Sequence, residues 1–127
     1  MSVLDNKYNL EMWQGATFAM TVTVKYANNT VQNLSGYSAR MQIRSSYDSG
    51  TVVESLTSSN GEITITGAEG NVALELAATR TANIAVVLNN GSPPKTTYVY
   101  DLELIDTGNR VSKLLFGNID VYGEVTR

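Results

Sequence analysis

The sequence predicts an all-β domain, an antiparallel sandwich of about seven or eight strands with one short helical crossover. Two observations lead to this fold class: several segments alternate apolar and polar residues, and turn signals rich in Gly, Asn and Ser separate them. The length of 127 residues fits one domain with a two-layer core. We therefore expect a single domain over 1–127, with 1–7 as a flexible N-terminal arm because this segment lacks a strand pattern.

Three segments alternate most strictly and are expected to be the long strands of the core. In 17–26 the inward set is Phe18, Met20, Val22, Val24 and Tyr26. In 37–44 and 98–105 the inward sets are Tyr37, Ala39, Met41, Ile43 and Tyr98, Tyr100, Leu102, Leu104. Shorter strands are predicted at 8–12, 51–56, 62–66 and 72–76, and one long strand or two at 110–125.

One segment interrupts the alternation. Residues 77–88 are rich in alanine, and Thr79 is placed to cap a short helical turn. We expect a helix of one or two turns here, crossing between the sheets. Pro93 and Pro94 lack the amide hydrogen that a strand ladder needs, so 89–96 is predicted to be a loop.

The hairpin that joins 98–105 to 110–125 admits two registers. A three-residue loop pairs Glu103 with Lys113 and turns Leu114 and Phe116 inward, but it then requires a bulge at Gly117. A two-residue loop needs no bulge, and we favour it for that reason. It keeps one apolar set on the inner face along the whole strand: Val111, Leu115, Ile119, Val121 and Val125.

The favoured register leaves Leu114, Phe116 and Tyr122 on the outer face of the last strand. An exposed apolar patch more often marks an interface than a bare surface. Trp13, in a turn, and Tyr47, in a Ser-rich loop, lie outside the inward sets and are also free for contact, although packing is the commoner role for a tryptophan. These five residues form the predicted interface.

Composition excludes most kinds of reactive site. The chain contains no cysteine and no histidine, which removes disulfides, the usual zinc ligands, thiolate nucleophiles and imidazole bases. Asp101 and Glu103 lie two apart on one strand face, but such carboxylates more often pair with basic side chains, here Arg40 and Arg44, than cleave glycosides. We expect no enzyme activity, no catalytic residue, no metal and no cofactor.

Charge and hydropathy bear on partners. Nine basic and 12 acidic residues give a formal net charge of −3, and the basic residues are scattered, which argues against nucleic-acid binding. No window approaches ~20 apolar residues and no apolar signal core follows Met1, so we expect no membrane span and synthesis in a cytoplasm. The sequence contains no phosphate-binding glycine loop, and a small-molecule ligand is not expected.

Several motifs, taken in order, resemble a known group of proteins. They are Gly-x-Thr-Phe at 15–18, Leu-x-Gly-Tyr-x-Ala-Arg-x-Gln-Ile-Arg at 34–44, Gly-x-Ile-x-Ile at 61–65, Tyr-Val-Tyr-Asp-Leu-Glu-Leu at 98–104 and Glu-Val-Thr-Arg at 124–127. Their order and spacing resemble small immunoglobulin-like (Ig-like) structural proteins of tailed bacteriophages, akin to the N-terminal domain of baseplate upper proteins. The resemblance covers nearly the whole chain. It implies an Ig-like β-sandwich that bridges or decorates other virion proteins, with no catalytic residues.

The expected function is therefore that of a phage virion structural or adaptor protein of the tail, baseplate or fibre-attachment apparatus. Its partners would be other virion proteins, in a homo-oligomer or symmetric assembly, and it would reside in the virion after synthesis in the host bacterial cytoplasm. A capsid decoration or head-fibre protein is an alternative with the same fold. A carbohydrate-binding adhesion module that uses Trp13 and loop tyrosines is the alternative from another class.

Overall fold

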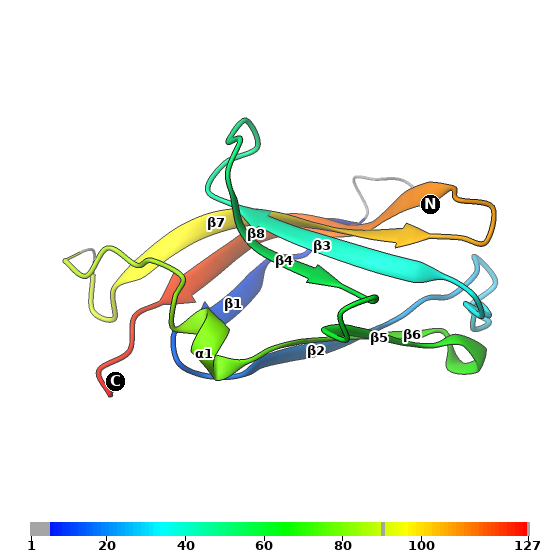
Figure 1. The fold of residues 1–127 in the computed structure, drawn as a ribbon, viewed down its shortest axis with the longest axis horizontal. Helices are drawn as coiled ribbons and strands as arrows, with labels where there is room; N and C mark the ends of the chain where they lie inside the picture. Colours follow the sequence, from blue (N-terminus) through cyan, green and yellow to red (C-terminus); the bar gives the residue numbers. More distant parts are fainter. Residues whose placement is uncertain (1–5, 90, 127) are drawn as a thin grey trace.

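The computed structural model describes residues 6–89 and 91–126, and these form two facing β-sheets (Figure 1). The larger sheet has the strand order β1 (Leu10–Trp13), β8 (Val111–Tyr122), β7 (Lys95–Ile105), β3 (Ser38–Arg44) and β4 (Val52–Thr57). The smaller sheet has the order β2 (Phe18–Thr23), β6 (Asn71–Leu76) and β5 (Ile63–Thr66). The prediction of an all-β fold with eight strands is confirmed.

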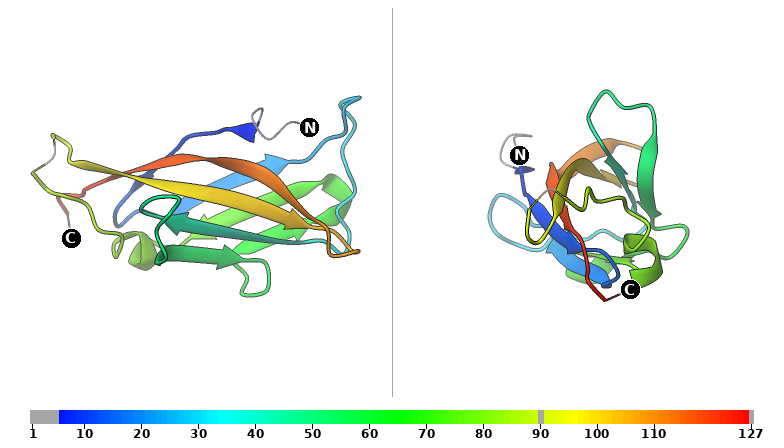
Figure 2. Two further views of the ribbon diagram at one scale, coloured as in Figure 1. Left: turned by 90° about the horizontal axis from the view of Figure 1, so that it is seen from above. Right: turned by 90° about the vertical axis from the view of Figure 1, so that its left-hand side faces the viewer.

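One pair of strands departs from the predicted antiparallel arrangement. β1 runs parallel to β8, with Trp13 opposite Tyr122, whereas every other paired strand is antiparallel. The hairpin argument did not apply to this pair, because β1 and β8 lie at opposite ends of the sequence and no tight turn sets their relative direction. Figure 2 shows β1 beside β8 at one margin of the larger sheet.

The crossover from β6 to β7 contains the predicted short helix, α1 (Ala78–Thr81). Thr79 does not cap it, as we had expected; the N-cap position is Ala77, which has no side chain that can do so. Thr81 instead is fully buried, and its hydroxyl donates to the carbonyl of Ala16, in the turn between β1 and β2. The helix therefore ties the crossover to both sheets. The 3₁₀ turn η2 (Gly67–Glu69) joins β5 to β6.

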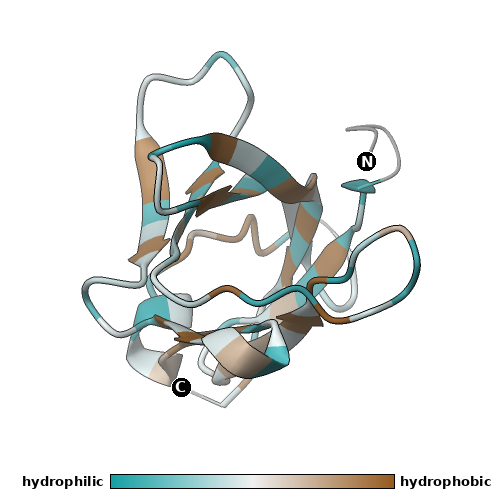
Figure 3. Cartoon of the chain, turned by 90° about the vertical axis from the view of Figure 1, so that its right-hand side faces the viewer, coloured by the Kyte–Doolittle hydropathy of each residue, from teal (hydrophilic) through white to brown (hydrophobic). Residues whose placement is uncertain are grey.

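The core lies between the sheets and is built from the alternating sets (Figure 3). The inward residues predicted for β7 and for Ala39, Met41 and Ile43 of β3 are all buried. Those of β2 face inward too, but Phe18, Met20 and Val22 are only half-buried because β2 is an edge strand. Tyr26 is 54% exposed, since β2 ends at Thr23.

The register of the β7–β8 hairpin differs from the one we favoured. Ile105 lies opposite Val111 and Glu103 opposite Lys113, as in the rejected alternative. An irregularity then inserts one extra residue, Leu114, so that Leu102 pairs with Leu115. The bulge lies at Leu114 rather than at Gly117, and Leu114 itself is buried. After the bulge, Leu115, Ile119 and Val121 face the core.

Two residues of the predicted N-terminal arm, Asn6 and Lys7, contact β8. Asn6 is buried, and its side-chain amide donates to the Lys113 carbonyl at 3.0 Å. Lys7 forms an isolated parallel β-bridge with Phe116, and the Tyr8 amide donates to the Phe116 carbonyl at 2.8 Å. These two residues and Tyr8 therefore lie alongside β8 ahead of β1. The remaining part of the predicted arm, 1–5, lies outside the described residues.

Candidate functional site

Two aromatic side chains stack at one end of the larger sheet. The parallel pairing of β1 with β8 puts Trp13 opposite Tyr122, and their ring centroids are 4.9 Å apart with an interplanar angle of 25°. Trp13 is 48% exposed, so one part of its indole remains open to solvent. The Tyr122 hydroxyl donates to Glu11 Oε2 at 3.2 Å. This aromatic pair presents a flat, anchored surface of the kind found at interface cores.

A groove runs beside Trp13, and we call it the Trp13 groove. The loop that precedes β7 forms one wall and the segment that follows β8 forms the other, and the two are joined by a hydrogen bond from the Gly123 amide to the Pro94 carbonyl at 2.9 Å. Its volume is about 690 Å³. Its lining is Trp13, Leu88, Ser92, Pro93, Pro94, Gly123, Glu124, Val125 and Thr126.

The lining of the Trp13 groove includes several exposed apolar side chains. Leu88 is 54% and Val125 is 95% exposed, and Pro93 and Pro94 also line the groove. Close approach of the two walls depends on Gly123, because a Cβ there would lie 2.8 Å from Pro94 Cγ. The groove is therefore an exposed apolar surface held in shape by main-chain contacts.

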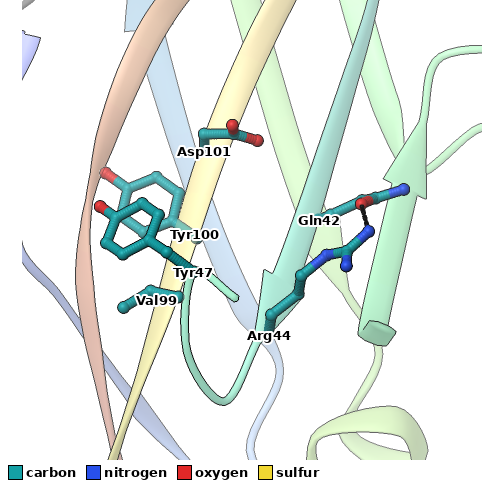
Figure 4. A pocket seen from close by; sticks show the side chains of 6 residues that line it. All are labelled: Gln42, Arg44, Tyr47, Val99, Tyr100 and Asp101. Atoms are coloured by element: carbon teal, nitrogen blue, oxygen red, sulfur yellow. Dashed lines mark hydrogen bonds between the residues drawn. The ribbon is translucent and has the colours of Figure 1, made fainter. Parts of the chain in front are cut away.

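The outer face of the larger sheet carries a second, smaller hollow (Figure 4). The loop between β3 and β4 brings Tyr47 to its rim, where the ring is 70% exposed. Arg44 donates to the Gln42 side chain at 2.9 Å and to the Ser49 carbonyl at 2.6 Å, which anchors this loop to β3. The hollow has a volume of about 210 Å³, which is below the usual range for a small-molecule pocket.

Asp101 and Glu103 take part in ion pairs, as predicted, but with a different set of partners. Arg40 donates to Glu103 at 2.7 Å, whereas Asp101 receives a 2.5 Å contact from Lys113 of β8 and not from Arg44. Burial opposes the charge on Lys113, but its hydrogen bond with Asp101 and the charges of Asp101 and Glu103 outweigh that effect and raise its pKa. This row of alternating charges is a solvated sheet face.

The structure brings together some residues of the predicted interface and separates others. Trp13 and Tyr122 are in contact, and Phe116 lies on the same outer face of β8, opposite Asp101. Tyr47 stands at the separate hollow of Figure 4. Leu114 does not belong to this surface, because the bulge places it in the core with 8% exposure.

Sequence reasoning missed the remaining walls of the Trp13 groove. We had expected Val125 on the inner face of a strand, but β8 ends at Tyr122, and Leu88 and the two prolines were considered only as breaks in the pattern. The juxtaposition of Pro94 with Gly123 could not be read from local periodicity. A run of apolar residues in a loop, Val86 to Leu88, was the available signal.

Comparisons with known proteins leave the chain without an assigned family. No protein-family model and no curated protein matches it. Among the described residues, no cluster of three or more potential metal ligands occurs. In the part of the chain that the structure describes, no helix is long and apolar enough to cross a membrane.

Proposed function

We propose that this protein is a structural or adaptor subunit of a tailed-phage virion, in the tail, baseplate or fibre-attachment apparatus, and that it acts by binding other proteins. The motif resemblance at 15–18, 34–44 and 98–104 supports the assignment to virions. The observation that carries the binding role is the Trp13 groove, an exposed apolar and aromatic surface at one end of the domain. Exposed apolar patches of this kind characterise interaction surfaces.

We also propose that the sandwich is Ig-like. If β2 to β8 are taken as strands B, C, C′, D, E, F and G, the larger sheet contains the order G-F-C-C′ and the smaller sheet the order B-E-D, as in Ig domains. A further feature supports this proposal. Tyr98, in the first half of β7, donates its hydroxyl to the carbonyl of Ala85 upstream, in the manner of the tyrosine that Ig domains carry near the start of strand F.

Tailed particles from the bacterium that carries the gene provide the direct test. Mass spectrometry of purified particles should detect the chain, and antibodies against it should label tails by immunoelectron microscopy. Labelling of heads would instead support the capsid decoration or head-fibre alternative. Absence from purified, infectious particles would refute a role in the virion.

The binding surface has its own test. Trp13→Ala together with Val125→Asp should leave the fold intact, because both side chains are exposed, but should reduce incorporation into particles at least tenfold. Tyr26→Ala is a matched control, since Tyr26 is a similarly exposed aromatic residue, 54%, in the connection between β2 and β3 and outside the lining of the Trp13 groove. Equal incorporation of both variants would exclude the Trp13 groove as the attachment surface.

A carbohydrate-binding module is the second candidate, and the exposed indole of Trp13 is the observation that favours it, because sugar rings stack on such surfaces. Binding to a glycan array that disappears in Trp13→Ala would establish this alternative. We favour protein binding because Leu88, Pro93, Pro94 and Val125 make the groove walls more apolar than polar, whereas sugar hydroxyls require several convergent polar groups.

A further inference from the structure

The two sheets end in four edge strands, β1, β4, β2 and β5, and three of these carry features that protect an edge from pairing with another chain. β1 and β5 have only four residues each, and β1 contains the exposed Glu11. β4 is distorted by an irregularity in its pairing near Arg44, and its Glu54 lies opposite the inward-facing Ile43. Short length, bulges and inward charges all discourage edge-to-edge association.

β2 carries none of these features. It has six residues, its pairing with β6 is regular throughout, and no charged residue occurs between Glu11 and Lys25. Its sequence, Phe-Ala-Met-Thr-Val-Thr, consists largely of residues that favour strands. An edge strand of ordinary length that is regular and uncharged is a template for a further strand.

Half of the main-chain hydrogen-bonding groups of β2 point toward its free edge, where they could pair with an added strand. The Val24 amide donates to the Gly70 carbonyl, in line with the β2–β6 register, so the even-numbered residues are those bonded to the neighbouring strand. The amides and carbonyls of Ala19, Thr21 and Thr23 therefore point away from β6, toward the free edge. Among the described residues, no strand occupies that side of β2.

The inner row of β2 is also incompletely covered. Val72, Leu74 and Leu76 of β6 are buried, whereas Phe18 and Met20 on β2 remain half-buried. They line a hollow of about 540 Å³ between β2 and the β1 side of the larger sheet. A strand added beside β2 would cover this apolar row as well as pair its main chain.

We propose that β2 pairs with β2 of a second copy of this chain, antiparallel, with Thr21 opposite Thr21. Opposite residues of an antiparallel pair share a sheet face, and centring on Thr21 uses the whole segment 18–24. Met20 then lies opposite Val22 on the inner face, and Ala19 opposite Thr23 on the outer face. Because the strand is uncharged, this self-pairing places no like charges opposite each other, and it joins the two small sheets into one of six strands.

The dimer uses a different surface from the proposed attachment site. β2 lies in the smaller sheet, and its free edge is not part of the Trp13 groove. The inference does not depend on a role in virions, and either proposal can fail alone. Trp13→Ala should leave the dimer unchanged, so a defect in attachment and a defect in dimerisation are separable.

A single cysteine tests both the surface and the register, because the native chain contains none. In the proposed pairing the two Thr21 Cα atoms are about 5.5 Å apart, which suits a disulfide. Thr21→Cys should give most of the protein as a covalent dimer under mild oxidation, seen on a non-reducing gel. Thr64→Cys, exposed on β5 of the same sheet, is the matched control and should stay monomeric.

Ala19→Cys tests the register. In the proposed pairing the two Ala19 positions are offset by four residues, roughly 13 Å, which is too far for a disulfide. It should cross-link no faster than Thr64→Cys. Cross-linking of Thr21→Cys at the rate of the Thr64→Cys control would overturn the proposal, and equal cross-linking of Ala19→Cys and Thr21→Cys would overturn its register.

The uncross-linked protein provides the second measurement. Sedimentation equilibrium should show twice the chain mass of 13.8 kDa, and Thr21→Lys, which places two ammonium groups opposite each other, should raise the dissociation constant at least tenfold with an unchanged circular dichroism spectrum. Thr64→Lys should have no effect. A wild-type protein that stays monomeric at every soluble concentration would refute self-pairing. That conclusion would hold even if β2 pairs with a strand of another protein.

Discussion

The two flanks of the sandwich, where the edges of the two sheets face each other, differ: an arginine closes one, and the other stays open. On the β4–β5 flank, Arg80 of α1 reaches between the sheets and contacts Glu54 of β4 at 2.5 Å and Glu62, which precedes β5, through its second terminal nitrogen. It also donates to the Ser55 carbonyl at 3.1 Å. The hydrogen bond with Glu54 raises the pKa of Arg80, although burial opposes its charge.

The β1–β2 flank has no such clasp. The Tyr100 hydroxyl donates to the Tyr8 carbonyl at 2.5 Å, which fastens the N-terminal segment to the larger sheet. Between that segment and Phe18 and Met20 of β2 the hollow of about 540 Å³ remains. Within residues 6–89 and 91–126, no ion pair crosses this flank.

The two flanks show that the β4 edge is protected against pairing with another strand and the β2 edge is not. An inward carboxylate held by an arginine makes the β4 edge unattractive to another strand, since pairing there would leave the charge pointing into a joined sheet. The uncharged β2 edge has no comparable obstacle. The closed flank contributes to stability, and the open flank is available for association. The following predictions test this division.

The largest effect is expected on the closed flank. Arg80→Ala leaves Glu54 and Glu62 together without their cation, and Glu62 already has one buried oxygen with no hydrogen-bond partner among the described residues. The free energy of unfolding should fall by about 2 kcal/mol, less than the loss for a fully buried pair because the Arg80 side chain is partly exposed. Urea denaturation measures this.

Arg40→Ala is the matched control, because Arg40 pairs with Glu103 on the solvated sheet face. It should cost less than about 1 kcal/mol. Adding Glu62→Gln to Arg80→Ala should restore part of the loss, since it removes one of the two facing charges. Equal losses for the two arginine variants would mean that the flank is not held by the Arg80 cluster.

A smaller effect is expected where the N-terminal segment packs on β8. A Cβ at Gly117 would lie 2.6 Å from the Tyr8 carbonyl oxygen and 2.9 Å from Asn9 Oδ1, so the segment must move. Gly117→Ala should cost about 1 kcal/mol and increase hydrogen exchange at 6–13. Gly50→Ala, with no neighbouring atom within 4 Å, should change neither. Unchanged exchange would show that this segment is held by other contacts.

The smallest effect concerns alkaline pH and belongs to the open flank. Burial, followed by the nearby Tyr8 and Tyr47, raises the pKa of Tyr100 above its ordinary value near 10, and burial also raises that of Tyr98. A raised pKa in the folded state means that stability is fully present below pH 10 and is lost as pH rises further. We expect Tyr100 alone to contribute a fall of about 1 kcal/mol between pH 10 and 11.

Tyr100→Phe identifies the group responsible. The variant should be less stable at neutral pH by about 1 kcal/mol because it loses the hydrogen bond to Tyr8. It should also show a shallower decline above pH 10. An unchanged decline in this variant would assign the alkaline sensitivity to other groups, such as Lys113, whose pKa is also raised.

Parts of the candidate site could be predicted from the sequence and parts could not. Trp13 and Tyr122 were recognised as residues outside the inward sets, but their contact depends on the parallel pairing of β1 with β8, which local patterns do not encode. Leu114 was misplaced because a bulge changes the alternation without leaving a mark in the sequence. Val125 was misplaced because β8 ends three residues earlier than its pattern suggested.

The sequence by itself determined the all-β class, the strand segments and the inward faces of the central strands β3 and β7, because alternation reflects burial on one face and is a local property. Tertiary structure alone decided which strands became edges, the direction of β1 and the meeting of Arg80 with two distant glutamates. Those outcomes depend on which segments lie together after folding. For the same reason, the exposed edge of β2 and the Trp13 groove became visible only in the folded chain.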